Sequence, residues 1–167
     1  GTPNEQYRYI SGNTNVHEYN PNGMYSLTIH GGFLASKLKC NSTLLDCVSA
    51  VIPEGVISIE GLFSGCNKLT SVSLPTTLKT IGTDTFNYCE NLTSIKIPDS
   101  VTDIGEEAFM YCKKLEKIII PNKVTSIEYQ AFSDCYKVKE ISIPNSVTTC
   151  NTSVIGFLGR DATELTV

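Results

Sequence analysis

The stretch LTSIKIPDSVTDIGEEAFMYCKK, residues 92–114, combines three local patterns within 23 residues. The apolar residues of LTSIKI (92–97) indicate an extended run, which Pro98 ends because proline has no N–H to donate to a β-ladder. A second short extended run follows in VTDIG (101–105). In EEAFMYC (106–112) the apolar residues recur at helical spacing, so this segment predicts a short helical turn.

The same combination returns along the chain. Proline, phenylalanine and cysteine each recur every 23 residues, apart from one 22-residue interval between the first two prolines. The positions are Pro53, Pro75, Pro98, Pro121 and Pro144; Phe63, Phe86, Phe109 and Phe132; and Cys66, Cys89, Cys112 and Cys135. A unit this short cannot bury its own apolar face, so successive units must stack with identical positions over one another. The repeat therefore predicts parallel sheets whose neighbouring strands lie roughly 4.7–4.9 Å apart.

Composition limits the kinds of partner. The chain has 167 residues, of which 41% are hydrophobic, and this fits one globular unit with a continuous core. Its formal net charge is −4, whereas nucleic acids and anionic membranes call for a basic surface. No apolar run approaches the roughly 18 residues of a membrane span. We therefore expect neither a nucleic-acid partner nor insertion into a membrane.

The pattern LxxIxIP, VxxIG and AFxxC resembles the leucine-rich repeat of the BspA-like class. The resemblance covers roughly residues 47–167. It implies an α/β leucine-rich-repeat solenoid, with stacked parallel β-strands, short helical turns and an N-terminal β-hairpin cap. It further implies a bacterial or protist protein that is secreted or attached to the cell surface and used for adhesion or protein–protein interaction.

The two ends depart from the repeat, as capping units do. We assign residues 1–46 to an N-terminal cap and residues 47–167 to the repeat array, together forming one continuous structural domain. In the cap, EQYRYISGN and MYSLTIHGG flank the turn signal NPNG and predict an antiparallel hairpin, whereas residues 31–46 look irregular. The closing segment ELTV predicts a last strand, whose open edge allows weak self-association of an otherwise monomeric chain.

The recurring cysteines are interpreted as packing residues. Free cysteine behaves as a small buried hydrophobe, and four of the seven cysteines occupy one inward position of the repeat. We expect Cys66, Cys89, Cys112 and Cys135 to be reduced and aligned beside Phe63, Phe86, Phe109 and Phe132. Disulfides within this row, or between Cys40 and Cys47, stay open as alternatives. A structural zinc site needs CxxC-like or HxxxH-like spacing, which the chain lacks, so no metal or other cofactor is expected.

Candidate catalytic groups are few, and an enzyme is not expected. The chain has two histidines, His17 and His30, and both fall in the cap, away from the recurring cysteines. The acidic pair Glu106 and Glu107 opens the expected helical turn, where carboxylates stabilise the helix dipole. No other repeat carries such a pair at matching positions. A hydrolase is therefore the least favoured interpretation.

The alternating pattern of the longer strands defines a candidate binding face. The outward positions are Ser71, Ser73, Ser94, Lys96, Glu116, Lys117, Ile119, Lys139, Glu140 and Ser142. Stacking in register places Glu116 beside Lys139 and Lys117 beside Glu140, so the charges compensate each other. Ile119 is the apolar centre of this face.

These features predict a non-catalytic interaction module that binds a protein, or a neutral glycan, through the outward face of its longer strands. The alternative is a passive spacer or stalk within a larger surface protein.

Overall fold

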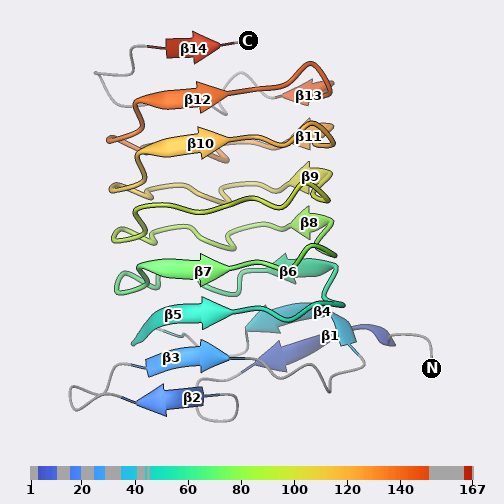
Figure 1. Ribbon diagram of the computed structural model, residues 1–167, viewed down its shortest axis with the longest axis vertical. Helices are drawn as coiled ribbons and strands as arrows, with labels where there is room; N and C mark the ends of the chain where they lie inside the picture. Colours follow the sequence, from blue (N-terminus) through green and yellow to red (C-terminus); the bar gives the residue numbers. More distant parts are fainter. Residues whose placement is uncertain are drawn as a thin grey trace.

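The computed structural model describes residues 4–10, 16–19, 25–28, 35–40, 44, 46–150 and 164–166. Within them the chain winds into a parallel β-solenoid whose repeats stack along the long axis (Figure 1). Each repeat contributes a longer strand on one side and a shorter strand on the other. Predicted elements of the chain between 151 and 163, including the departures from the pattern at 155 and 158, lie outside the described residues.

The shorter strands form one seven-stranded sheet. Its order is β1 (Asn4–Ile10), β4 (Ala35–Cys40), β6 (Ser58–Glu60), β8 (Thr80–Ile81), β9 (Asp103–Ile104), β11 (Ser126–Ile127) and β13 (Thr149–Cys150). All its pairings are parallel, and Ile59, Ile81, Ile104 and Ile127 follow one another in register. These isoleucines are fully buried, which is why each VxxIG segment presents this residue to the core.

The longer strands form two separate sheets. One has the order β2 (Val16–Tyr19), β3 (Tyr25–Thr28), β5 (Cys47–Val51) and β7 (Ser71–Ser73). The other has the order β10 (Lys117–Ile119), β12 (Glu140–Ser142) and β14 (Glu164–Thr166). The expected strand in ELTV is thus present as β14, and it ends the described part of its sheet.

The N-terminal hairpin is present, but one of its strands differs from the prediction. β2 and β3 pair antiparallel, whereas β1, which contains EQYRYI, pairs parallel with β4 on the opposite side of the solenoid. The expectation that residues 31–46 are irregular was wrong for Ala35–Cys40, since this segment is a strand paired with both β1 and β6. A continuous parallel sheet offers its backbone more partners than an isolated cap would.

The core contains the predicted rows of phenylalanine and cysteine. Phe63, Phe86, Phe109 and Phe132 are all 0% exposed, and successive rings stack with centroids 5.2–5.4 Å apart. Cys66, Cys89, Cys112 and Cys135 are also 0% exposed and free of disulfides. Each of the last three thiols donates a hydrogen bond of 3.2 Å to the carbonyl of the phenylalanine one repeat earlier. Cys47 is a free buried thiol as well, which removes the Cys40–Cys47 disulfide.

The expected helical turns were wrong, because no helix occurs in the described residues. The AFxxC segment is instead a series of tight turns. In the repeat at 105–112, Glu107 and Tyr111 have φ angles of 53° and 58°, and a residue in this left-handed region interrupts a right-handed helix.

The hydrogen bonds of this segment also leave the helical pattern. Phe109 N donates to Ala131 O in the next repeat at 2.7 Å, whereas Cys112 N donates to Phe109 O within its own turn at 3.3 Å. The N–H groups thus alternate between the neighbouring repeat and the local turn. The turns therefore contribute a third inter-repeat ladder, which stacks the repeats as the two kinds of strand do.

A candidate binding face interrupted by a groove

The outward surface of the four-stranded and three-stranded sheets, together with the segment between them, is called here the long-strand face. All ten residues predicted for this face are exposed: Ser71, Ser73, Ser94, Lys96, Glu116, Lys117, Ile119, Lys139, Glu140 and Ser142. They are exposed because the inward positions of the same strands, such as Ile118 and Ile141, fill the core. The alternation of the strands places the predicted residues on one surface.

The predicted charge pairing is confirmed for one pair. Lys117 and Glu140 are register partners of β10 and β12, and their side chains form an ion pair of 3.4 Å. Glu116 and Lys139 are neighbours across the same repeats, since Lys139 N donates to Glu116 O at 3.0 Å. Both side chains of the ion pair are about half exposed, so solvent screens their attraction and it adds little stability.

The sheet is interrupted in the middle of this face. Residues 92–97 have the repeat sequence of a longer strand but form no strand, which separates β7 from β10 (Figure 1). Between 93 and 97, the one described backbone hydrogen bond runs from Glu116 N to Thr93 O at 3.4 Å. The edges of β7 and of this segment are therefore not joined by a ladder.

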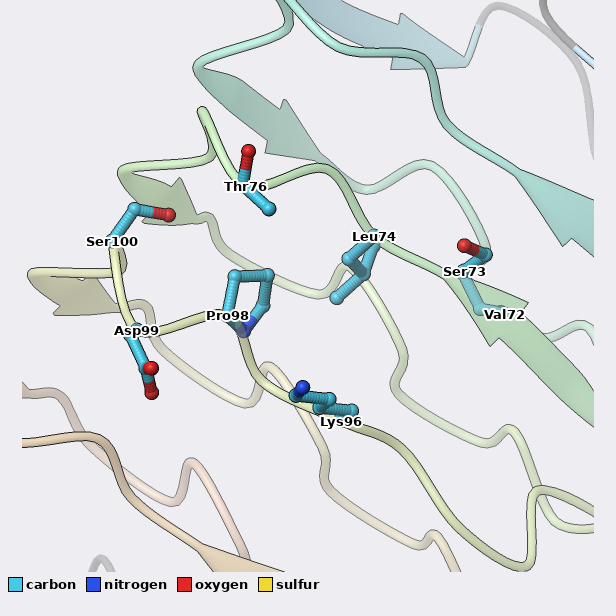
Figure 2. Close-up of a pocket in the computed structure, with 8 residues that line it drawn as sticks. All are labelled: Val72, Ser73, Leu74, Thr76, Lys96, Pro98, Asp99 and Ser100. Carbon is cyan, nitrogen blue, oxygen red and sulfur yellow. The ribbon is translucent and has the colours of Figure 1, made fainter.

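Two adjoining grooves follow the interruption. The first has a volume of about 500 Å³ and lies between β7 and the 92–97 segment (Figure 2). Its lining residues are Val72, Ser73, Leu74, Thr76, Lys96, Pro98, Asp99 and Ser100. In Figure 2 Leu74 and Pro98 lie next to each other in the middle of the groove, with Lys96 and Asp99 at its margin.

The second groove has a volume of about 280 Å³ and lies between the 92–97 segment and β10. Ile95, Ile97, Ile119 and Pro121 supply its apolar lining, and Lys96 and Asp99 border both grooves. Ile95 packs against the core but stays partly exposed, as Val72 and Leu74 do in the first groove. The interruption thus makes apolar residues of the inward row accessible from outside.

The charged groups at this place are available to a ligand. Neither Lys96 nor Asp99 takes part in an ion pair or a side-chain hydrogen bond with another residue of the described range 46–150. Lys117, in contrast, is engaged by Glu140. The grooves therefore carry one free cation and one free anion beside an apolar floor.

Sequence reasoning missed Val51 on the same face. Val51 pairs with Ser73 in register, and Ser73 lies 23 residues before Lys96 and 46 before Ile119. Val51 is 46% exposed and Ile119 is 57% exposed. The repeat spacing itself could have identified this residue, since the first strand of the array was left out when the outward positions were assigned.

The exposed aromatic residues lie elsewhere. Tyr88, Tyr129 and Tyr136 are each more than 40% exposed, and all three come from the turn segments and not from the longer strands. They were not singled out in the sequence, although Tyr88 and Tyr111 are one repeat apart. An aromatic binding surface on the sheets themselves is therefore absent from the described residues.

The groups considered for chemistry are separated from one another. Glu107 lies in a turn, where burial raises its pKa and the negative charge of Asp84 adds to the effect. The described residues contain no cluster of three or more histidine, cysteine or acidic side chains that could hold a metal ion. In the same residues no helix is long and apolar enough to cross a membrane. His17 and His30 have no described side chains.

Comparison with known proteins agrees with this architecture. Residues 40–156 match the profile of a family described as "BspA type Leucine rich repeat region", in six copies. A leucine rich repeat protein of T. pallidum superposes with a TM-score of 0.68 at 23% identity, over 80% of this chain and 71% of that one. That likeness concerns the fold alone.

Two further solved structures are similar in sequence as well as fold. A leucine rich cell surface protein from Faecalibacterium prausnitzii has 27% identity and a TM-score of 0.63, over 82% of this chain. A leucine-rich repeat protein from Bacteroides ovatus has 31% identity and a TM-score of 0.61, over 84% of this chain. The chain spans 38% and 34% of their lengths. No curated protein matches the sequence.

Proposed function

The chain belongs to the BspA-type leucine-rich repeat family, and from this premise we propose that it is a non-catalytic interaction module of a bacterial surface protein, which binds a polypeptide through the long-strand face. The surface location is supported by the F. prausnitzii relative, which is described as a cell surface protein. Because the chain spans about a third of this relative and of the B. ovatus protein, the proposal concerns the module.

The observation that carries the proposal is the pair of grooves at residues 92–97. Ile119 is the most exposed large apolar side chain among the described residues, and it borders a groove whose floor includes Ile95 and Ile97. An interface hot spot typically combines an apolar pocket that loses its water with polar groups around it. Lys96 and Asp99 supply such a rim.

A polypeptide suits these grooves better than a neutral glycan does. An aliphatic side chain of the partner fills the apolar floor, and carboxylate or amide groups of the partner pair with Lys96 and Asp99. A glycan site commonly offers an aromatic ring, which the described long-strand face does not have. The neutral glycan is therefore the weaker alternative for this face.

The spacer is a second candidate function, favoured by the composition of the rest of the face. Ser71, Ser73, Ser94 and Ser142 are small and polar, and Lys117 is neutralised by Glu140. Such a surface keeps a repeat array soluble without recognising anything. The groove at 92–97 is what separates the binding module from the spacer.

The test uses a phage-displayed library of 12-residue peptides. Peptides selected on the wild-type protein are measured against Ile119→Asp, which places a charge at the apolar groove. The matched control is Ile57→Asp, because Ile57 is also an exposed isoleucine but approaches the seven-stranded sheet. Binding lost in Ile119→Asp and kept in Ile57→Asp supports the proposal. Selection that yields no peptide, or peptides that bind Ile119→Asp equally well, favours the spacer.

A further inference from the structure

A pair of stacked tyrosines stands on the turn side of the solenoid, away from the long-strand face. The rings of Tyr88 and Tyr111 lie one repeat apart, with centroids separated by 4.7 Å and an interplanar angle of 17°. Tyr136 lies nearby in the sequence of the next repeat, and its hydroxyl donates to Asp134 at 3.0 Å. The stacking follows from the repeat, since equal positions in successive turns come to lie over one another.

The stack ends at Tyr88. The position one repeat earlier is Gly65, which has no side chain to continue it. Gly65 N donates to Asn87 O at 2.9 Å, so the glycine backbone runs directly beside the segment that carries Tyr88. Within the described residues, Tyr111 is the one ring that contacts Tyr88.

One face of the Tyr88 ring is therefore open. Tyr111 covers the other face, yet 43% of Tyr88 stays exposed to solvent. This exposure needs the uncovered face on the side of Gly65, because edges alone contribute little of the area of a ring. The ring is also held in place, since Tyr111 stacks behind it and its backbone has a φ of 57° fixed by the turn.

The groups around this face are polar and electrically balanced. Glu90 and Lys113 form an ion pair of 3.2 Å, and Lys113 Nζ lies 5.9 Å from the centre of the Tyr111 ring. Asn67 follows Gly65 by two residues, as Glu90 follows Tyr88. The Asn67 side chain is exposed and has no hydrogen-bond partner among the residues that the structure describes.

We propose that the open face of Tyr88 is a stacking site for a pyranose ring of a neutral saccharide, with Asn67 and Glu90 binding its hydroxyl groups. The C–H groups on one side of a pyranose ring are apolar and pack against an aromatic face, while its hydroxyls need planar amide and carboxylate partners at the margin. A ring already fixed by stacking loses little conformational freedom when the ligand binds. The site is separate from the long-strand face and does not depend on it.

Other ligand classes fit the geometry less well. An anionic ligand would need uncompensated cations, but Lys113 is paired with Glu90, and the chain has a net charge of −4. A proline-rich peptide docks into grooves between aromatic residues. Tyr88 and Tyr111 lie 4.7 Å apart in direct stacking and leave no such groove between them.

The experiment begins with an array of neutral oligosaccharides built from glucose, galactose, mannose and N-acetylglucosamine. The oligosaccharide with the strongest signal is then titrated in solution and followed by tyrosine fluorescence, since the chain has 8 tyrosines and no tryptophan. Tyr88→Asn removes the ring while keeping a residue that tolerates a positive φ. Tyr88→Phe keeps the ring, and Tyr129→Asn is the matched control at a tyrosine that is 41% exposed.

Loss of the stacking contact is expected to weaken binding by about tenfold or more in Tyr88→Asn. Tyr88→Phe and Tyr129→Asn should stay within about threefold of wild type. Binding that is unchanged in Tyr88→Asn overturns the proposal, as does an array on which no neutral saccharide binds. Binding of decaproline in place of a saccharide overturns it as well. Ile119→Asp should leave saccharide binding unchanged, which keeps this result distinct from the polypeptide test.

Discussion

Replacing Cys112 with alanine should change stability in a direction that depends on pH. The thiol is fully buried, and its Sγ donates to Phe86 O at 3.2 Å. Burial raises its pKa well above the ordinary value of 9.0, and the neighbouring thiols of Cys135 and Cys89 add to this shift. At neutral pH the protonated thiol fills its place. Cys112→Ala then leaves a small cavity and lowers the free energy of unfolding by about 1–2 kcal/mol, extrapolating from larger truncations.

Above about pH 9 the comparison changes sign. The unfolded chain releases the thiol proton, whereas the folded protein keeps it, so the stability that this group contributes falls by about 1.4 kcal/mol for each further pH unit. This loss is present in the wild type and absent in Cys112→Ala. The two stability curves should therefore cross roughly one pH unit above the ordinary thiol pKa, near pH 10.

The assay is urea unfolding followed by far-ultraviolet circular dichroism between about pH 7 and pH 10.5, with a reductant present. Val124→Ala is the control, because Val124 is also fully buried but cannot ionise, and its cost should stay constant over this range. A difference between wild type and Cys112→Ala that is equally constant would refute the reasoning, since the folded thiol would then titrate like an unfolded one.

Two further predictions concern the stacking of the repeats. Phe109→Ala should lower the free energy of unfolding by about 3–5 kcal/mol, because Phe109 is stacked on both sides. Phe63→Ala should cost about 0.5–1.5 kcal/mol less, since Phe63 has one described stacking partner; equal urea midpoints for the two variants would contradict this. Gly105→Ala should cost about 1–3 kcal/mol, because a Cβ there would lie 2.6 Å from Thr83 N and 2.7 Å from Gly82 C. Thermal unfolding measures this cost, and a variant as stable as wild type would show that the repeats can move apart.

The sequence predicted those features that depend on the repeat period alone. Stacking at equal positions placed Phe109 over Phe86 and Cys112 over Cys89, and strand alternation placed Lys117 and Glu140 side by side on the surface. Both follow once the units stack, because identical positions then lie at identical places. The candidate binding residues were located for the same reason, although their role in binding is still a proposal.

The sequence did not predict the features that long-range hydrogen bonds decide. Ala108, Phe109 and Cys112 have a spacing that fits both a helical turn and consecutive tight turns. The choice depends on bonds to the next repeat, such as Phe109 N to Ala131 O. The interruption at residues 92–97 was equally hidden, since this segment has the same pattern as its paired neighbours.

Amide hydrogen exchange across residues 93–97, with and without a peptide selected on the long-strand face, is the most direct test of the proposed binding site. If the sheet is interrupted there, amides such as those of Ser94 and Lys96 should exchange quickly in the free protein, while Ile118 and Ile141 in β10 and β12 stay protected. Bound peptide should slow exchange in 93–97 and leave Ile57 unchanged. Slow exchange of this segment in the free protein, or no added protection when the peptide binds, would contradict the account.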